Sequence, residues 1–235
     1  MSDHTSKQFD AEMEGVRSGV LSMGGLVERQ IARGIALLGE EPDRRVVEAV
    51  GADEQEINQL QVDIDQLCSQ IIARRQPTAV DLRMIMTVSK IVNDLERIGD
   101  EVKKVAYKAS RVEDVGRLRS LRAHDVERMA CGVQQMLQKA LDAFARLDVN
   151  AVAEVVAEDK MIDRSFNAIM RQLISFMMED PRTISEALEV VFIAKSIERI
   201  GDHAKNIAES VVHVVTGKDV RHATADEIRA EVAQE

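Results

Sequence analysis

The chain has 235 residues, of which 45% are hydrophobic and only 3% aromatic, and it carries a formal net charge of -10. This length is enough for one large domain or two small ones, each with a buried core. The charge comes from 31 basic and 41 acidic side chains, and this excess of acid argues against general nucleic-acid binding, which needs a basic surface.

Proline, glycine and polar clusters divide the chain into six predicted helices. The first helix ends at the cluster Gly39–Asp43, and the break around Pro77 separates the second helix from the third. Breaks at 148–150 and around Pro181 divide the second half in the same way, and Gly217 is expected to stop the last helix. The predicted helices cover about residues 9–39, 43–76, 79–110, 117–147, 151–179 and 183–216.

Apolar residues in the third and sixth predicted helices recur at alternating spacings of four and three. This spacing is typical of a helix that packs nearly parallel or antiparallel to its neighbours. No segment alternates apolar and polar residues as a strand would, so the predicted fold class is all-α. The residues at this spacing are Val88, Val92, Leu95, Gly99, Val102, Ala106 and Ala109, and then Val190, Ala194, Ile197, Gly201, Ala204, Ala208, Val211 and Val215.

The two halves of the chain repeat each other. A break containing proline precedes both the third and the sixth helix, and the segment GADEQEIN at 51–58 corresponds to AEDKMID at 157–163. We therefore expect an internal duplication that gives two similar antiparallel three-helix bundles with short connections. The predicted division is 1–112 for the first bundle, 113–217 for the second and 218–235 for a charged C-terminal tail.

The pentapeptide ERIGD occurs once in each half. Residues four apart on a helix lie on the same face, so Glu96 and Asp100 form one acid pair, and Glu198 and Asp202 form the other. Like charges at this spacing repel each other by about 0.2–0.5 kcal/mol. We therefore expect a cation or a basic side chain to offset each pair.

A glycine lies inside each copy, at Gly99 and Gly201, on the apolar stripe of its helix. Glycine in a helix interior costs up to about 1 kcal/mol relative to alanine. We predict that both glycines allow the backbone of a neighbouring helix to approach closely. Such an approach would bring acidic side chains of the preceding helix near each acid pair.

Polar residues near the start of the second and fifth helices are candidate further ligands. In hairpins that close near Pro77 and Pro181, these residues lie at about the height of the acid pairs. Each half would then gather three or four oxygen ligands without nitrogen or sulfur, which favours the hard cations Mg, Mn, Ca or iron. The candidates are Asp53, Glu54 and Asn58 in the first half and Glu158, Asp159 and Asp163 in the second.

An ordinary charged helix face is the alternative interpretation of a single acid pair, with Arg97 paired to Asp94 or Glu101. The duplication with an embedded glycine favours a metal site. His203 stands where the first half has Glu101, and we expect a surface histidine, with a supplementary metal ligand as the alternative. No catalytic residues are identified, and the Glu-x-x-His pattern of ferritin-like di-iron proteins is absent from the sequence.

The cysteines and the N-terminus favour a soluble protein of the cytosol. Cys68 and Cys131 are isolated and are expected to be reduced, partly buried thiols rather than zinc ligands. The first residues lack the apolar segment of a secretory signal, and no uncharged apolar run approaches the roughly 20 residues of a membrane span. The methionines expected to fill the core are Met84, Met86, Met177 and Met178.

Taken together, these motifs resemble the PhoU family of accessory proteins of bacterial phosphate-specific transport systems. That family carries a duplicated E(D)xxxD motif, which corresponds to the two ERIGD copies. The resemblance extends over nearly the whole chain. It includes QFDAEMEGVRSGVLSMGGLVE at the start, IIARRQPTAVDLR before the third helix and RQLISFMMEDPRTI before the sixth.

The resemblance implies two similar three-helix bundles and a divalent or trivalent metal ion (Fe, Mn, Mg or Zn) held by carboxylates. The first half has Asn58 where the second has Asp163, so its site has one carboxylate fewer. Asp94 also differs from its counterpart, Ser196. The motif residues carried over by position are Glu96, Asp100, Glu198 and Asp202, with Asp53, Asp159 and Asp163 as additional candidates.

The resemblance also implies a cytoplasmic signalling adaptor that is not an enzyme. It would connect the ATPase subunit of the phosphate ABC transporter to a phosphate-sensing histidine kinase and repress the phosphate-starvation response when phosphate is plentiful. A homodimer, contact with the inner membrane only through partners, and no nucleic-acid partner are the corresponding expectations. A carboxylate-ligated metalloenzyme and a purely structural helical scaffold are the alternatives.

Overall fold

The computed structural model describes residues 2–39, 43–111, 118, 121–220 and 227. These residues form long helices and no strand, which confirms the predicted all-α fold class. A short π-helix, η1 (Arg122–Val126), leads into the fourth long helix, and a 3-10 turn, η2 (Pro181–Thr183), leads into the last one. The long helices are α1 (Ser2–Gly39), α2 (Arg44–Arg75), α3 (Ala79–Ala109), α5 (Glu127–Arg146), α6 (Asn150–Glu179) and α7 (Ile184–Thr216).

The helix ends lie close to the predicted breaks. Asp43 caps α2, because its side chain accepts a hydrogen bond of 2.8 Å from the backbone N–H of Arg45. Gly217 ends α7 in the left-handed conformation, with φ 78°, as expected of a glycine after a helix. The first helix begins at Ser2, earlier than the predicted start near Phe9. The predicted boundary at 112 and most of the predicted tail lie outside the described residues.

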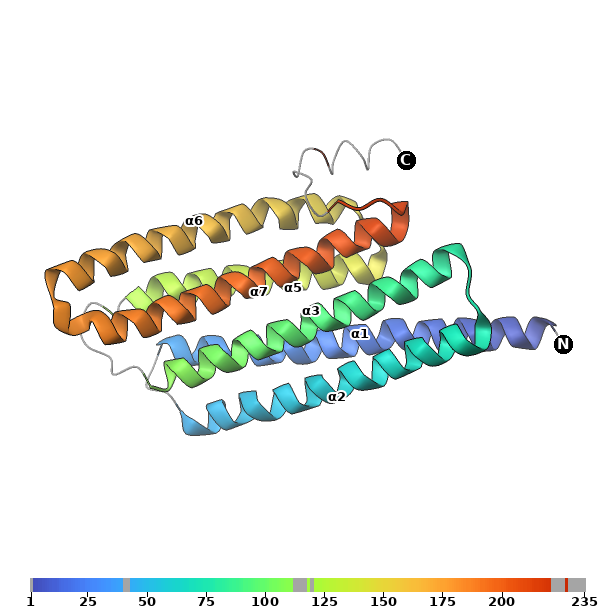
Figure 1. The fold of residues 1–235 in the computed structure, drawn as a ribbon, viewed down its shortest axis with the longest axis horizontal. Coiled ribbons are helices and arrows are strands. Elements are labelled where there is room, and N and C mark those ends of the chain that lie inside the picture. The colour runs from blue at the N-terminus through green and yellow to red at the C-terminus, as the bar shows by residue number, and fades with distance from the viewer. Residues whose placement is uncertain (1, 40–42, 112–117, 119–120, 221–226, 228–235) are drawn as a thin grey trace.

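The six long helices form two groups of three that lie side by side (Figure 1). Helices α1, α2 and α3 pack against one another, and α5, α6 and α7 do the same. Helices α3 and α7 pack along their lengths between the groups, and α1 also contacts α5. Helices α3 and α7 are antiparallel, since Lys108 near the end of α3 bonds to Glu189 near the start of α7. The fold is therefore a pair of three-helix bundles joined through their third helices.

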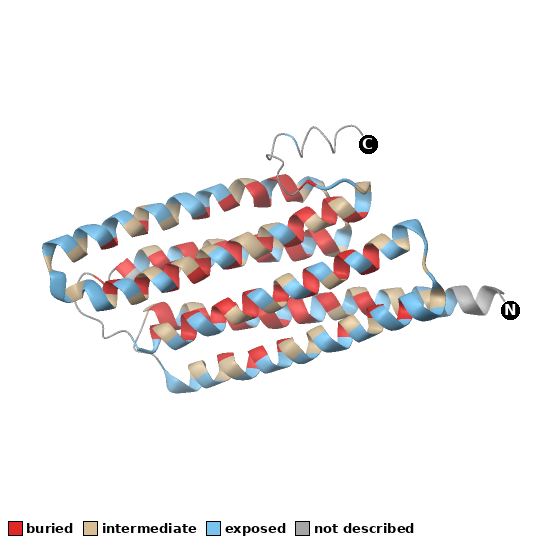
Figure 2. Ribbon diagram, in the orientation of Figure 1, coloured by how far each residue is buried: buried red, intermediate tan, exposed pale blue. Residues whose placement is uncertain are grey.

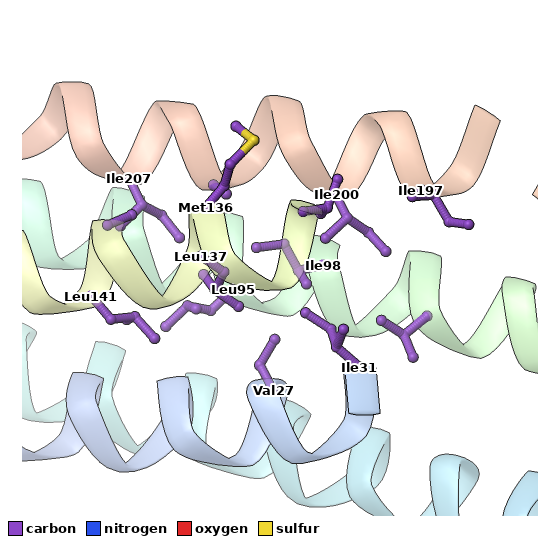
Figure 3. Close-up of a cluster of buried hydrophobic side chains, with 14 of the residues drawn as sticks. Val27, Ile31, Leu95, Ile98, Met136, Leu137, Leu141, Ile197, Ile200 and Ile207 are labelled. Atoms are coloured by element: carbon purple, nitrogen blue, oxygen red, sulfur yellow. The ribbon is translucent and has the colours of Figure 1, made fainter. Parts of the chain in front are cut away.

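Buried residues line the inward faces of the helices (Figure 2). The residues at the spacing of four and three on α3 and α7 form much of this core, and Leu95 and Ile98 are fully buried. The core continues from one group into the other. Figure 3 shows side chains from both groups in one cluster, which includes Val27, Ile31, Leu95, Ile98, Met136, Leu137, Leu141, Ile197, Ile200 and Ile207.

Two methionines and one cysteine are more exposed than predicted. Met84 belongs to the core, but Met86 is 52% exposed and Met178 is 80% exposed, so the prediction of core filling is wrong for these two methionines. Cys68 is buried and Cys131 is exposed. Burial raises the pKa of the Cys68 thiol to about 11, which keeps it protonated at neutral pH.

None of the described helices contains an apolar stretch of the length and composition that a bilayer span requires.

Candidate functional site

The acid pair of the first half lies beside polar side chains of α2. We name Glu54, Asn58, Glu96 and Asp100 the first acid group. The carboxylate of Glu54 is buried and accepts a hydrogen bond of 3.0 Å from the amide of Asn58. Burial raises the pKa of Glu96, and the charges of Asp100 and Glu54 raise it further. Glu96 is thus surrounded by like charge from its own helix and from α2.

The acid pair of the second half lies beside two aspartates of α6. We name Asp159, Asp163, Glu198 and Asp202 the second acid group. Burial raises the pKa of Asp202, with further contributions from the charges of Glu198 and Asp159. The pKa of Asp163 is raised by burial, then by the charges of Asp159 and Glu198. Asp159, Asp163, Glu198 and Asp202 thus lie within electrostatic reach of one another, whereas Glu158, the fifth candidate of this half, pairs with Lys139 of α5.

Asp53 does not join the first acid group. Its carboxylate faces α1, where Arg29 donates at 3.2 Å and Arg33 forms a second ion pair. Glu54, the next residue and also one of the candidates named from the sequence, lies beside the acid pair instead and corresponds to Asp159 of the second half. Aligning ADEQEIN with AEDKMID residue by residue would have given this correspondence, since Ile57 then matches Ile162.

Basic side chains hold the acids that face α1 and α5. Arg33 of α1 pairs with Asp53, and Lys139 of α5 pairs with Glu158, the residue that corresponds to Asp53. Each half therefore has a basic residue on its first helix that pairs with the first acid of the corresponding segments 52–58 and 157–163.

Basic side chains also reach the acid groups themselves. Lys103 lies 2.9 Å from Glu54, and Lys205 lies 2.8 Å from Asp159. In the second group, Lys195 pairs with Glu198. The sequence predicted that a cation or a basic side chain would offset the acid pairs, but it did not identify these lysines.

The two motif glycines face side chains rather than a helix backbone. A Cβ atom on Gly99 would lie 3.2 Å from Ile57 and 3.2 Å from Gln30. A Cβ atom on Gly201 would lie 3.5 Å from Val133 and 3.7 Å from Ile162. The prediction of a close backbone approach is therefore wrong in detail, because it is the side chains of the preceding helices that fill the space.

The donor chemistry of the acid groups suits a hard cation, because carboxylate oxygens dominate and their mutual repulsion calls for positive charge. The side chains are not arranged around a metal position, however. Among the described residues, no group of three or more histidines, cysteines, aspartates and glutamates is placed to hold a metal ion. Lysine and arginine side chains supply the positive charge instead.

Polar contacts connect the two halves between α3 and α7. The Nδ1 atom of His203 lies 2.8 Å from the Asp94 carboxylate, so this histidine is an internal contact and not a free surface residue. Glu101 is buried and bonds to Lys104 at 2.9 Å and to Arg199 at 3.4 Å. Burial acts to raise the pKa of Glu101, but the hydrogen bonds from its partners outweigh burial and lower the pKa below its ordinary value.

Arg97 does not make either of the ion pairs considered from the sequence. Its nearest acid is Glu96 of its own motif, at 3.8 Å, and the arginine side chain is 60% exposed. A pair with this geometry and exposure contributes little to stability.

A family model described as the PhoU domain matches the chain twice, over residues 20–109 and 126–211. The phosphate-specific transport system accessory protein PhoU homolog of Pseudomonas aeruginosa is 46% identical over 233 residues, which are 99% of this chain and 95% of that protein. The phosphate-specific transport system accessory protein PhoU of Escherichia coli is 41% identical over 231 residues, which are 97% of this chain and 93% of that protein.

Solved structures show the same likeness. The crystal structure of PhoU from Pseudomonas aeruginosa matches with a TM-score of 0.83 and 45% identity, covering 89% of this chain and 100% of that one. The crystal structure of the phosphate transport system regulatory protein PhoU from Streptococcus pneumoniae matches with a TM-score of 0.81 and 25% identity, covering 90% of this chain and 99% of that one.

Proposed function

The chain belongs to the PhoU family, and from this premise we propose that it serves as an accessory and regulatory protein of a phosphate-specific transport system. The observation that carries the proposal is the match of both halves to the PhoU domain, together with relatives of that description that align along almost the entire chain.

In its finer form, the proposal is that the protein represses the phosphate-starvation response. It does so as a cytoplasmic adaptor between the ATPase subunit of the phosphate ABC transporter and a phosphate-sensing histidine kinase of the inner membrane. Exposed apolar side chains support a docking role, because large exposed apolar residues that share a helix face are typical of interaction surfaces. Ile184, Leu188 and Phe192 follow one another at a spacing of four on α7, with exposed fractions of 42%, 43% and 51%.

Deletion of the gene in its host tests the regulatory proposal. We expect phosphate-scavenging activities to be expressed in medium rich in phosphate, and a plasmid copy of the gene to restore repression. Normal repression in the deletion strain would contradict the proposal. A complementing copy with Leu188→Asp and Phe192→Asp tests the α7 surface, with Met178→Asp on α6 as a control for exposed charge.

Metal binding at the two acid groups is a separate part of the proposal. The residues that would hold a divalent or trivalent ion are Glu96 and Asp100 with Glu54, and Glu198 and Asp202 with Asp159 and Asp163. Elemental analysis of the purified protein for Fe, Mn, Mg and Zn tests it. We expect bound metal, of which the part held by the second group is lost in Glu198→Gln/Asp202→Asn and the part held by the first group in Glu96→Gln/Asp100→Asn. Absence of metal and of any thermal shift with Mn²⁺ would contradict the proposal.

A purely structural role of the acid groups is the competing interpretation, and the ion pairs of Lys103 and Lys205 favour it. Under this interpretation, the acid pairs and lysines only hold the helices of each bundle together. Metal binding and regulation are independent properties, so loss of the metal proposal would leave the adaptor proposal intact. A homodimer remains part of the proposal and is tested by light scattering of the purified protein.

A further inference from the structure

The repeated motif is longer than the pentapeptide ERIGD. The first copy continues as ERIGDEVK and the second as ERIGDHAK, so both end on a lysine three residues after the aspartate. These lysines are Lys103 and Lys205. Residues three apart on a helix are neighbours on its surface, which places each lysine next to the acid pair of its own helix.

Each lysine reaches across to the same place on the preceding helix. Lys103 lies 2.9 Å from Glu54, whose side chain is 9% exposed. Lys205 lies 2.8 Å from Asp159, whose side chain is 8% exposed. Because Glu54 and Asp159 correspond in the two halves, the ion pair is repeated along with the motif.

The buried carboxylates require these partners. A carboxylate that is taken out of water without a counterion is costly, and removal of one partner from a buried ion pair leaves that cost uncompensated. The acid pair on the neighbouring helix adds like charge beside each buried carboxylate, because its two members share one helix face. Each lysine bonds to the buried carboxylate and lies within one helical turn of that acid pair, so it offsets this repulsion in both groups.

We propose that Lys103 and Lys205 are built-in counterions of the two acid groups and compete with an added metal ion for the carboxylates. A metal ion that binds Glu54 or Asp159 displaces the lysine ammonium group. The lysine side chain then rotates, so that its ammonium group lies in the solvent at the edge of its bundle. The lysine side chains are 52% and 28% exposed, so a path to solvent exists for both. The competition rests on the proposed metal binding, but the counterion role does not.

The competition also selects for ion charge. The ammonium group already provides one positive charge inside the protein at no entropic cost of association. A monovalent ion gains nothing by replacing it, whereas a divalent or trivalent ion brings additional charge to three or four mutually repelling oxygens. We therefore expect Na⁺ and K⁺ to leave the ion pairs of Lys103 with Glu54 and of Lys205 with Asp159 intact.

The test replaces each lysine by methionine, which keeps the length of the side chain and removes the charge. The variants are Lys103→Met and Lys205→Met, with Lys160→Met as the matched control, because Lys160 is exposed on α6 next to Asp159. Mn²⁺ and Mg²⁺ are titrated into the full-length proteins by calorimetry and by thermal melting, with NaCl at equal ionic strength as a reference.

Without metal, we expect the melting temperature of Lys205→Met to fall below that of the wild type. We expect the dissociation constant of Lys205→Met for Mn²⁺ to be lower than that of the wild type by roughly tenfold or more. A group beside a metal site typically has an effect of this size. Lys103→Met should behave in the same way at the first group, and Lys160→Met should match the wild type. The two halves provide independent tests if one variant does not fold.

Equal Mn²⁺ affinity in the wild type and in both methionine variants would overturn the inference while leaving metal binding intact. Binding of Mn²⁺ by Lys205→Met but not by the wild type would support the inference and contradict metal binding by the natural protein. Absence of binding in all variants would overturn the competition as well, because removal of the competing charge should then reveal the site.

Discussion

At the scale of single residues, Asp202 shows the electrostatic cost of the repeated motif most directly. Its pKa is raised by burial and by the charges of Glu198 and Asp159, although Lys205 and Lys195 oppose the shift. The ionised carboxylate is thus less favourable in the folded protein than in the unfolded chain. This residue opposes folding at neutral pH, and its contribution vanishes as the pH falls through the raised pKa toward the ordinary value of 3.8.

We therefore predict that Asp202→Asn stabilises the metal-free protein at pH 7. The expected gain in the free energy of unfolding is about 0.5 kcal/mol, the size of a like-charge pair at this spacing with allowance for screening by solvent. The gain should shrink as the pH is lowered toward 4, where the wild-type carboxyl becomes protonated. Urea unfolding at the two pH values measures it.

Asp180→Asn is the control for that experiment. The hydrogen bonds from Arg182 lower the pKa of Asp180, so its charge favours the folded state and its removal should not stabilise the protein. If both variants gain free energy of unfolding, the stabilisation comes from the loss of net negative charge and not from the relief of local repulsion at Asp202.

The two motif glycines are predicted to respond differently to substitution by alanine. At Gly201 the new Cβ meets Val133 at 3.5 Å, an ordinary contact, so Gly201→Ala should stabilise by about 0.5–1 kcal/mol through helix propensity. At Gly99 the contacts of 3.2 Å require Ile57 and Gln30 to move, so Gly99→Ala should gain less or lose stability. Leucine at either position should destabilise by about 1–3 kcal/mol.

Thermal melting of both alanine variants tests this difference, and both leucine variants serve as the overpacked reference. An equal rise in melting temperature for Gly99→Ala and Gly201→Ala would show that the space beside Gly99 is larger than the structure indicates.

At the scale of whole elements, the helices could be predicted because their signals are local. Breaks near Pro77 and Pro181, and the spacing of apolar residues on α3 and α7, depend only on neighbouring positions. The choice between Asp53 and Glu54 could not be predicted in this way. Asp53 is three residues after Val50 and Glu54 is four after it, so they flank the buried stripe of α2 on opposite sides.

Which flank faces α3 depends on the handedness of the bundle, and no local pattern in the sequence states it. In the structure, the side chain of Asp53 faces α1 and the side chain of Glu54 faces α3. The same limit applies to His203, whose partner Asp94 belongs to the other half of the chain. Contacts between the halves depend on how α3 and α7 are paired, and that pairing follows from the core as a whole.

The contact between α3 and α7 gives a prediction for Glu101. This carboxylate is buried and joins Lys104 of its own helix to Arg199 of α7. Glu101→Ala should destabilise by about 1–2 kcal/mol, below the value for a fully buried pair because both basic partners remain half exposed. Chemical unfolding of Glu101→Ala, Arg199→Ala and the double variant measures the coupling between the residues.

A coupling energy near zero between Glu101 and Arg199 would show that Arg199 does not stabilise the contact between α3 and α7. Arg97→Ala provides the matched control. Arg97 occupies the same place in the first motif as Arg199 does in the second, yet its ion pair with a described residue is the weak contact of 3.8 Å with Glu96.

At the scale of the whole molecule, the duplication has not produced two separate bodies. The cluster of Figure 3 draws side chains from α1 and α3 of the first bundle and from α5 and α7 of the second. Leu95 and Leu137, on opposite sides of the junction, are both fully buried. Separation of the bundles would expose this apolar surface to water, at a cost of about 25 cal/mol for each Å².

We therefore predict that the two bundles unfold together. Differential scanning calorimetry of the full chain should show one transition whose calorimetric and van 't Hoff enthalpies agree. Leu137→Ala, at the junction, should lower the temperature of that single transition, because it removes packing from both bundles at once. Two resolved transitions in the wild type, with only the second half affected by Leu137→Ala, would instead mean that each bundle is stable alone and that the shared core contributes little to the folding of either.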